Sequence, residues 1–555
     1  MITRRESAAD ARRGRARFAL LIATLAGCSQ FARVGLLDSQ DGGAPDDHVA
    51  PDEAVGDAGE EAPRGDPMSI EECGATNAAG LSSAQISALR AGGTLPAGAR
   101  LLYPYDGTVF PSGLAAPLLM WEGVAPQAVL LAARSERLSY EGCFVPRAPG
   151  QLSVPDTLWK AAERAGTNAD DPLEIAFTLL EQGKVRGPLR VSLVLSAQPM
   201  QGTLYYASYG SPSAGANNIA AVMRLPLGGT AAPFVAPAGT CAGCHAASAD
   251  GSTVLLANSG MGQSYRPAPS SSAPPQPTSS MLSGVEYAAV DPSGMFYVAG
   301  SMSTGTGPRR MAPGPASAAL LSLGGLSVPA DTGLPGAALT PQFSPDGRWL
   351  AFNDMTDSAG HELAALSFSS QRLAFTQRRV LYSHASLFPA WPSFRPDNQQ
   401  LVFALGERAD FGANGTLLIA GRAAPGPASD LHLTDLTGAT STMLYRAMGF
   451  TSAEATRDED SYLPFGAEDL HQNYYPSVLP RAAEDYDWVF FDSVRHYGDQ
   501  GIKRGLWCAA LDVKPGSSPD RDPSHPAFFV PGQELGPPNL RPVAVRALGA
   551  TSDAK

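Results

Sequence analysis

Short apolar runs that follow tight-turn sequences recur through the second half of the chain. Ser344–Gly347 (Ser-Pro-Asp-Gly) precedes Trp349–Phe352, and Arg395–Asn398 precedes Leu401–Phe403. Proline, aspartate and glycine favour tight turns, and short β-branched or aromatic runs favour buried strands. Each string therefore predicts a turn that leads into a strand. The same order occurs at Ser248–Gly251 before Val254–Leu256, at Asp291–Gly294 before Phe296–Val298, and at Leu479–Pro480 before Trp488–Phe491.

The spacing of these units predicts a ring of similar sheets. Gly251, Gly294, Gly347 and Asn398 follow one another at intervals of 43, 53 and 51 residues. This interval is the period of a four-stranded propeller blade. The string Ser344–Phe352 resembles the turn-plus-strand unit of TolB-like (WD-type) β-propellers, and that resemblance implies the same architecture here.

Two further segments supply a sixth unit. Gly202–Tyr206 and Ala221–Leu225 are expected to form outer strands, and Asn539–Val545 is expected to add the missing strand and close the ring. We therefore expect an all-β fold with a six-bladed TolB-like β-propeller over 199–548; the alternative is a sandwich of unrelated hairpins. Large aromatic residues in or beside these strands are expected to pack between blades and not to act as stacking platforms: Trp349, Trp391, Trp488, Phe352 and Phe403.

A separate module is expected before the propeller. Residues 98–198 carry strand periodicity with proline corners, and Trp121 lies in an apolar run. The pattern resembles an Ig/fibronectin III-like β-sandwich, in which a tryptophan packs between the sheets. Two stretches inside it, Asp156–Arg164 and Asp171–Gln182, are predicted to be helical. A short helical segment over 71–97, with its helix near Ser83–Arg90, is expected to precede the sandwich.

The first residues indicate export. Six arginines lie before the apolar run Phe18–Ala26, which is too short to span a bilayer and fits a secretory signal. Leu25–Cys28 (Leu-Ala-Gly-Cys) resembles the lipobox of bacterial lipoproteins. The resemblance implies a signal peptide over 1–27, lipidation of Cys28, and an outer-membrane destination because Ser29 follows. The alternative is an ordinary signal with a coincidental cysteine.

The segment after Cys28 is expected to be a disordered acidic tether over 28–70. Residues 38–66 hold ten acidic residues and one basic residue, with no apolar periodicity, so they cannot bury enough surface to offset their chain entropy. The whole chain carries a formal charge of −13, which gives no footprint for nucleic acid. The expected contacts are membrane lipid through Cys28 and an unidentified protein or redox partner.

Thr240–His245 (Thr-Cys-Ala-Gly-Cys-His) is the most chemically specific string in the chain. It matches the c-type haem attachment motif, in which two cysteines form thioethers with the haem and the next histidine binds the iron. This interpretation assigns haem c to Cys241 and Cys244, with His245 as the proximal iron ligand. The alternatives are a disulfide between Cys241 and Cys244, or half of a zinc site. The downstream chain reads as a hairpin and departs from small cytochromes c.

A haem at this place would need a second axial ligand. The repeat phase puts the motif just before an inner hairpin, near the mouth of the ring, so candidates come from equivalent loops. They are ranked His471, then Met261, then His384. The remaining cysteines, Cys73, Cys143 and Cys508, allow one disulfide, but the sequence does not choose the pair.

Three classes of function are compatible with these features. The first is an envelope lipoprotein whose propeller carries one haem c for electron transfer or redox sensing. The second is a haem-free propeller that acts as a protein-binding scaffold, with Cys241 and Cys244 joined as a disulfide. An enzyme is the weakest hypothesis, because the sequence contains no nucleophile elbow with an identifiable base, no His-Glu-x-x-His and no phosphate-binding glycine loop.

Overall fold

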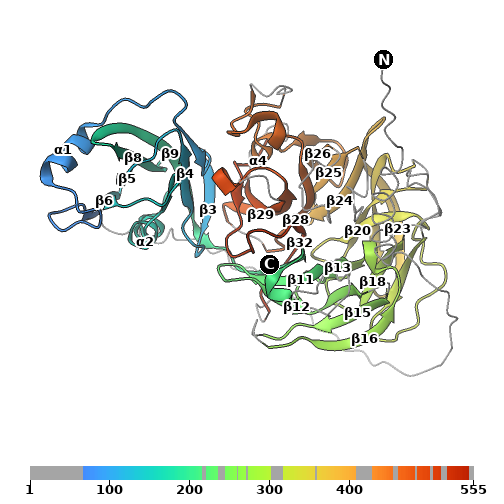
Figure 1. The fold of residues 1–555 in the computed structure, drawn as a ribbon. Helices are drawn as coiled ribbons and strands as arrows, with labels where there is room; N and C mark the ends of the chain where they lie inside the picture. Colours follow the sequence, from blue (N-terminus) through green and yellow to red (C-terminus); the bar gives the residue numbers. More distant parts are fainter. Residues whose placement is uncertain are drawn as a thin grey trace, which may run out of the picture.

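The protein consists of a β-sandwich followed by a ring of sheets (Figure 1). The computed structural model describes residues 67–215, 220–235, 244–258, 261–269, 273–301, 317–356, 359–407, 428–453, 460–481, 484–500, 504–513 and 522–548. The expected signal peptide and Cys28 lie outside these residues, as do Cys241 and the tether up to residue 66.

Six sheets of three or four strands form the ring, so the six-bladed propeller is confirmed. We number the blades from the one that contains β10. Blade 1 is β12 (Ala232–Val235), β11 (Ala220–Pro226), β10 (Thr203–Tyr209) and β32 (Asn539–Val545). Blade 2 is β13 (Cys244–Ala247), β14 (Val254–Asn258), β15 (Met261–Arg266) and β16 (Gln276–Leu282). Blade 3 is β17 (Ala289–Val290), β18 (Phe296–Ser301) and β19 (Ser317–Ser322).

Blades 4 to 6 continue the same order of strands. Blade 4 is β20 (Ala338–Phe343), β21 (Trp349–Asp354), β22 (Glu362–Ser369) and β23 (Ala374–Ser383). Blade 5 is β24 (Phe388–Phe394), β25 (Gln400–Gly406), β26 (Ser429–Asp435) and β27 (Ser441–Met443). Blade 6 is β28 (Asn473–Val478), β29 (Tyr486–Ser493), β30 (Gly505–Asp512) and β31 (Phe528–Phe529). Short helical turns lie between strands: η2 (Pro212–Ala214), η3 (Val285–Tyr287), α4 (Tyr445–Met448), η5 (Gly466–Asp469) and η6 (Gly498–Gln500).

The ring closes by pairing the end of the chain with its first blade. Strand β32 runs antiparallel to β10, with Val545 opposite Thr203 and Asn539 opposite Ser208. The closing strand predicted from the sequence is therefore confirmed, with the same bounds. Closure removes the open edges that an isolated pile of blades would expose.

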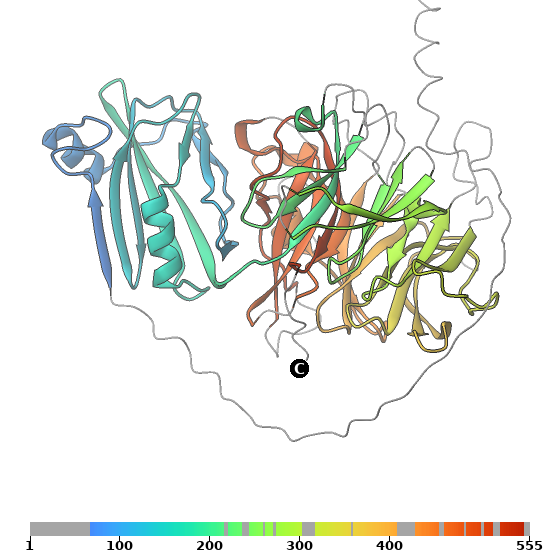
Figure 2. The same cartoon turned by 90° about the horizontal axis from the view of Figure 1, so that it is seen from below.

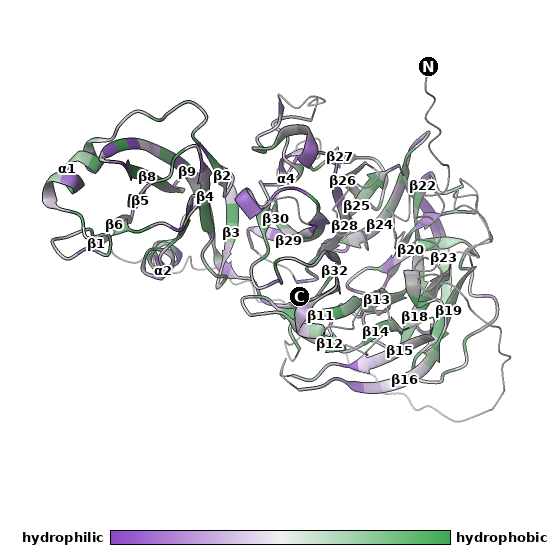
Figure 3. Ribbon diagram, viewed as in Figure 1, coloured by the Kyte–Doolittle hydropathy of each residue, from purple (hydrophilic) through white to green (hydrophobic). Residues whose placement is uncertain are grey.

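Local sequence explains the turn that joins the first and second strands of a blade. The Ser344 hydroxyl donates to the Asp346 carboxylate and accepts from the Trp349 N–H, and Gly347 adopts a positive φ of 71° that a side chain would disfavour. Ser248, Asp250 and Gly251 repeat this arrangement in blade 2. The strands that follow are buried and hydrophobic, as Figure 3 shows along β14 and β25.

The N-terminal module is a two-sheet sandwich, as expected. One sheet has the order β1-β6-β5-β8-β9-β3 and the other β2-β4-β7, and Trp121 packs against Phe177 of the facing sheet. Its elements are β1 (Met68–Glu72), α1 (Ser83–Ala91), β2 (Arg100–Tyr103), β3 (Thr108–Ser112), β4 (Leu118–Glu122), β5 (Ala128–Ser135), β6 (Leu138–Phe144), β7 (Gln151–Ser153), α2 (Asp156–Ala165), β8 (Leu173–Glu181) and β9 (Lys184–Pro199).

Two expectations for this module need correction. The stretch Asp171–Gln182 is not helical: it forms β8, in which Leu173, Ile175 and Phe177 are buried on one face. The two-residue alternation and the pairing with β5 and β9 override its helix-favouring leucines and glutamates. The module also begins before residue 98, because β1 pairs in parallel with β6.

A disulfide joins Cys73 to Cys143 and so resolves the pairing that the sequence left open. Cys143 lies in β6, and Cys73 follows β1, the strand that pairs with it. Cys508 is fully buried in β30, and burial raises the pKa of its thiol well above the ordinary value, which makes it inert.

The sandwich packs directly on blade 6 (Figure 2). Phe110 of β3 stacks on Phe528 of β31, and the Phe529 N–H donates to the Tyr103 hydroxyl. Buried residues of both modules belong to one continuous hydrophobic core. The two modules therefore pack against each other through a buried apolar interface.

Replacing Cys73 with alanine should lower the free energy of unfolding of the sandwich by about 2–4 kcal/mol, because the disulfide restricts the unfolded chain. Urea unfolding followed by tryptophan fluorescence measures this change. A reducing agent should destabilise the wild-type protein equally and leave the Cys73→Ala/Cys143→Ala variant unaffected. Equal stability of wild type and variant would refute a structural role for the bond.

Candidate binding site in the central channel

The inner strands of the blades surround a channel at the centre of the ring. Lining residues come from β13, β20, β24, β28 and β32, and from Tyr287 and Ala288 just before β17. About 60 Å³ of the channel accepts the centres of water molecules, and one water needs roughly 10–15 Å³ of such space. The channel is therefore narrow and holds a small number of waters.

One position of the inner strand is equivalent in all six blades. This position lies four residues before the start of the turn between the first and second strands. We call the six residues that occupy it the bulge ring. Its members, from blade 2 onward to blade 1, are Cys244, Tyr287, Thr340, Trp391, Tyr475 and Arg541.

Four members of the bulge ring share an unusual backbone. Thr340, Trp391, Tyr475 and Arg541 have φ values of 46°, 56°, 52° and 52°, and the pairing register shifts at each of these places. A proline follows every one of them. Left-handed conformations of bulky residues cost of order 1–3 kcal/mol each and cluster at functional sites. The bulges redirect these side chains, and all four residues line the channel.

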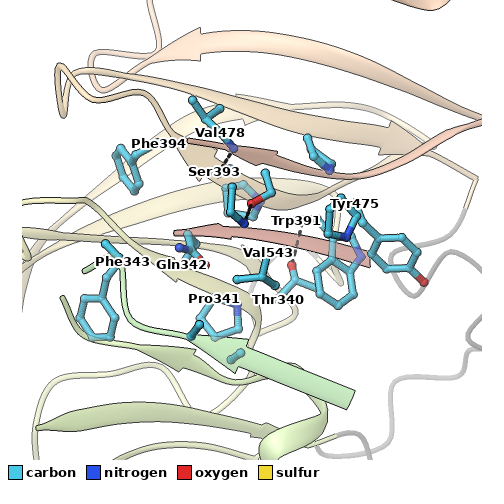
Figure 4. Close-up of a pocket in the computed structure, with 18 of the residues that line it drawn as sticks. Thr340, Pro341, Gln342, Phe343, Trp391, Ser393, Phe394, Tyr475, Val478 and Val543 are labelled. Carbon is cyan, nitrogen blue, oxygen red and sulfur yellow. Dashed lines mark hydrogen bonds between the residues drawn. The ribbon is translucent and has the colours of Figure 1, made fainter. Parts of the chain in front are cut away.

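Trp391 connects several blades across the channel. Its ring lies 4.7 Å from the Tyr475 ring in an edge-on arrangement and 5.8 Å from the Tyr287 ring. Its backbone N–H donates to the Thr340 hydroxyl at 3.1 Å. Figure 4 shows Trp391 and Tyr475 together at one end of the channel, with Phe343 and Phe394 at the other. Trp391 is partly buried and packs against the hydrophobic core between blades, as expected, and it also lines the channel.

Arg541 brings a positive charge to the same end. Its guanidinium lies 4.6 Å over the Trp391 ring, a distance at which cation–π attraction operates. Its backbone N–H donates to the Asp492 carboxylate at 2.8 Å, and Arg504 donates to the other oxygen of Asp492 at 2.6 Å. The Arg504 guanidinium in turn lies 4.6 Å over Tyr474. A buried ion pair thus holds the bulge of β32 in place.

Side-chain hydrogen bonds link neighbouring blades around the channel. The Ser393 hydroxyl of blade 5 accepts from the Val478 N–H of blade 6, and the Ser477 hydroxyl of blade 6 accepts from the Ala544 N–H of blade 1. His245 makes the corresponding link between blades 2 and 1, because its Nε2 lies 3.2 Å from the Tyr205 carbonyl oxygen. A carbonyl only accepts, so Nε2 carries the proton.

The structure therefore places His245 in a seam between blades. Its side chain has an exposed fraction of 0%. It occupies the position that is proline in four other inner strands, and β13 pairs with β14 without a register shift. Cys244 precedes it and is partly buried, whereas Cys241 lies outside the described residues. A haem iron would need the Nε2 of His245, and in this structure that atom is bonded to the Tyr205 carbonyl oxygen. The described residues do not fit a haem in this conformation.

The three candidate distal ligands come from other elements of the fold than His245. His471 precedes β28 and its Nδ1 lies 2.7 Å from the Asp430 carboxylate of β26. His384 follows β23 and its Nδ1 accepts the Leu387 N–H. Met261 is the first residue of β15. Within the described ranges, no group of three or more His, Cys, Asp and Glu side chains is arranged to hold a metal ion.

Trp391 and Arg541 were missed as site residues from the sequence. A usable signal was present, since a bulky residue followed by proline recurs four positions before the turn in four repeats: Thr340-Pro341, Trp391-Pro392, Tyr475-Pro476 and Arg541-Pro542.

The chain matches no protein-family model and no curated protein. Among solved structures it is similar to TolB from Acinetobacter baumannii, with 11% identity over 74% of this chain and 90% of the other and a TM-score of 0.37. It is also similar to the periplasmic gluconolactonase of Pseudomonas aeruginosa, with 13% identity over 62% and 99% of the two chains and a TM-score of 0.29. The propeller assignment rests on the chain's own sheet order.

The pair formed by His471 and Asp430 predicts a pH dependence. The hydrogen bond to the Asp430 carboxylate raises the pKa of His471 above its ordinary value, so folding favours the protonated imidazole. This contribution is complete below the unfolded pKa of about 6.5 and is lost as the pH rises through the higher folded pKa. Urea midpoints between about pH 5.5 and about pH 8.5 should therefore fall more steeply for wild type than for His471→Asn.

The Asp430→Asn variant serves as the matched control, because it removes the partner and should flatten the profile in the same way. Identical slopes for wild type and both variants would show that the His471–Asp430 pair does not contribute to the pH dependence of stability.

Proposed function

We propose that this chain is an envelope protein whose propeller acts as a haem-free, protein-binding scaffold. The observation that carries the proposal is the position of His245, which is fully buried with its Nε2 bonded to the Tyr205 carbonyl. In this role the motif residue fastens blade 2 to the closing blade. The partly exposed end of the channel, where Trp391 and Arg541 lie, is then the surface offered to a partner.

The close packing of the two modules supports the proposed scaffold function. The sandwich and the propeller share one hydrophobic core, so a partner would meet a preformed surface and would not have to order it on binding. Gln151 of β7 also donates to Asp499 beside β29 and β30, at 2.7 Å, which fixes the orientation of the sandwich relative to blade 6.

An envelope location follows from the export signal at the start of the chain. The arginine-rich segment, the apolar run Phe18–Ala26 and the lipobox-like Leu25–Cys28 support a location outside the cytoplasmic membrane, with lipid on Cys28 and the outer membrane as the proposed site of attachment. In the described part of the chain, no helix has the length and apolar character to cross a bilayer.

Full-length protein produced in a host that matures c-type cytochromes should carry no covalent haem. A denaturing gel stained for haem peroxidase activity tests this directly, and thiol titration should find Cys241 and Cys244 oxidised to a disulfide. A stained band at the mass of the chain that disappears in Cys241→Ser and Cys244→Ser would overturn the proposal and establish haem attachment.

A His245 variant tests by a second measurement whether this side chain links blades 1 and 2 or serves as a haem ligand. His245→Phe leaves the Tyr205 carbonyl without this donor and should lower the free energy of unfolding by about 1–3 kcal/mol. His384→Phe is the matched control: it removes the acceptor of the Ser386 and Leu387 N–H groups in an interblade loop, and it should cost less because this loop is less buried than His245. If His245→Phe were as stable as wild type, the proposed role of His245 in joining blades 1 and 2 would be contradicted.

Lipid attachment through Cys28 gives a further prediction. Cys28→Ala should move the protein from the membrane fraction to the soluble fraction, because burial of acyl CH₂ groups, at about 0.8 kcal/mol each, holds it at the membrane. Cys508→Ala is the control and should stay with the membranes. Continued membrane attachment of Cys28→Ala would refute the anchor.

A further inference from the structure

The seam where the ring closes contains buried oxygen atoms without a hydrogen-bond partner. Ser208 of β10 and Asn539 of β32 lie directly opposite each other in the closing strand pair, and both residues are buried, with exposed fractions of 0% and 1%. In the described part of the chain, the Ser208 Oγ, the Asn539 Oδ1 and the buried Oε2 of Glu534 have no hydrogen-bond partner. An unpaired buried polar atom costs free energy, so three of them at one seam indicate that something binds there.

Hydrogen bonds bring these three residues together. The Asn539 Nδ2 donates to the Glu534 carbonyl oxygen at 2.9 Å and to the Gln533 Oε1 at 3.1 Å. Both contacts require the amide nitrogen, so the oxygen of the same amide is the atom left without a partner. Glu534 also lies close to β10, because burial and then the Glu534 carboxylate raise the pKa of Tyr206, two residues before Ser208.

The Glu534 carboxylate has no cationic partner among the described residues. Its Oε1 accepts the Ser213 N–H at 3.3 Å, its Oε2 is buried, and it makes no ion pair there. A carboxylate oxygen removed from water is costly unless a cation compensates its charge. A water molecule could complete the hydrogen bonds at these atoms but would leave the negative charge uncompensated. A cation would meet both requirements.

The chemistry of the three oxygen atoms selects the kind of cation. One carboxylate, one amide and one hydroxyl oxygen form a set without nitrogen or sulfur, which suits a hard cation. Ca²⁺ accepts carboxylate oxygens, amide oxygens and waters in flexible arrangements, whereas Mg²⁺ demands a near-ideal octahedron. Glu534 is only partly buried, so waters can complete the coordination from outside.

The same residues connect the closing strand to blade 6. The Asn539 backbone N–H donates to the Arg504 carbonyl oxygen, just before β30, at 3.0 Å. Gln533, next to Glu534, hydrogen bonds to both the N–H and the carbonyl oxygen of Leu506 in β30. An ion held by Glu534 and Asn539 would therefore join β32 to a segment that is already fixed to blade 6.

We infer that Ser208, Glu534 and Asn539 bind a calcium ion that fastens the closing strand β32 to blade 6. The ion acts on the stability of the ring and not on the channel. The inference thus goes beyond the proposed scaffold function and does not depend on it.

Thermal unfolding of purified full-length protein tests the site, first in EDTA and then in Ca²⁺ at constant ionic strength. An ion that binds only the folded ring raises the melting temperature, and wild type should gain at least about 2 °C at about 10 mM Ca²⁺. Melting is the suitable measurement because the acidic segment 38–66, which is expected to be disordered, would bind Ca²⁺ equally before and after unfolding.

Glu534→Gln removes the charge and keeps the shape of the side chain. In EDTA this variant should melt at or above wild type, because it lacks the unpaired carboxylate, and in Ca²⁺ it should melt below wild type. Glu174→Gln, at an exposed glutamate of β8, is the matched control and should respond to Ca²⁺ as wild type does. Ser208→Ala should need at least about tenfold more Ca²⁺ for the same rise.

Crystals soaked in Tb³⁺, which replaces Ca²⁺, should show an anomalous peak within about 2.6 Å of the Glu534 carboxylate and the Asn539 Oδ1. An equal Ca²⁺ response in wild type and Glu534→Gln, no response in wild type, or an ordered water alone at this place would overturn the inference. An equal rise with Mg²⁺ would refute the choice of calcium. None of these results changes the haem stain, which tests the scaffold proposal separately.

Discussion

Closure of the ring by β32 is the constraint on which the rest of the structure depends. A propeller blade buries its faces only against two neighbours, so an open ring would leave blades 1 and 6 with unpaired faces. The pairing of β32 with β10 joins the end of the chain to its first blade. The sandwich then covers the outside of blade 6 through Phe110 and Tyr103. Blades 1 and 6 are therefore each covered by a segment that is far away in the sequence.

A closed ring also decides what the channel can be. Six inner strands that converge on one axis leave little space, and the bulges at Thr340, Trp391, Tyr475 and Arg541 turn bulky side chains toward it. The hydroxyls of Ser393 and Ser477 accept hydrogen bonds from the adjacent inner strands, and His245 joins β13 to β10 of blade 1. The channel is for this reason a rigid, narrow site, in which small differences between side chains determine what binds.

The fold was predictable where the signal is local. Turn strings such as Ser344–Gly347 specify their own geometry through side-chain hydrogen bonds, and so the blades and even the closing strand could be found from sequence. Features that depend on residues far apart in the sequence could not be predicted in this way. Strand β8 has helix-favouring residues and becomes a strand because β5 and β9 flank it, and the choice of Cys143 for Cys73 depends on the parallel pairing of β1 with β6. The role of His245 likewise depends on a carbonyl forty residues earlier, at Tyr205.

The repeats themselves separate what the fold requires from what the site can vary. Positions that build the blade remain alike within this one chain: the turn residues recur, and the residue after the bulge ring is proline in four of six inner strands. The bulge ring shares a backbone conformation in four blades, yet its side chains are Cys, Tyr, Thr, Trp, Tyr and Arg. A packing requirement common to all blades would have kept these side chains similar. Their diversity on a common backbone points to the ring as the place where this propeller carries its specific chemistry, and to His245, one residue further along, as part of the framework that holds it.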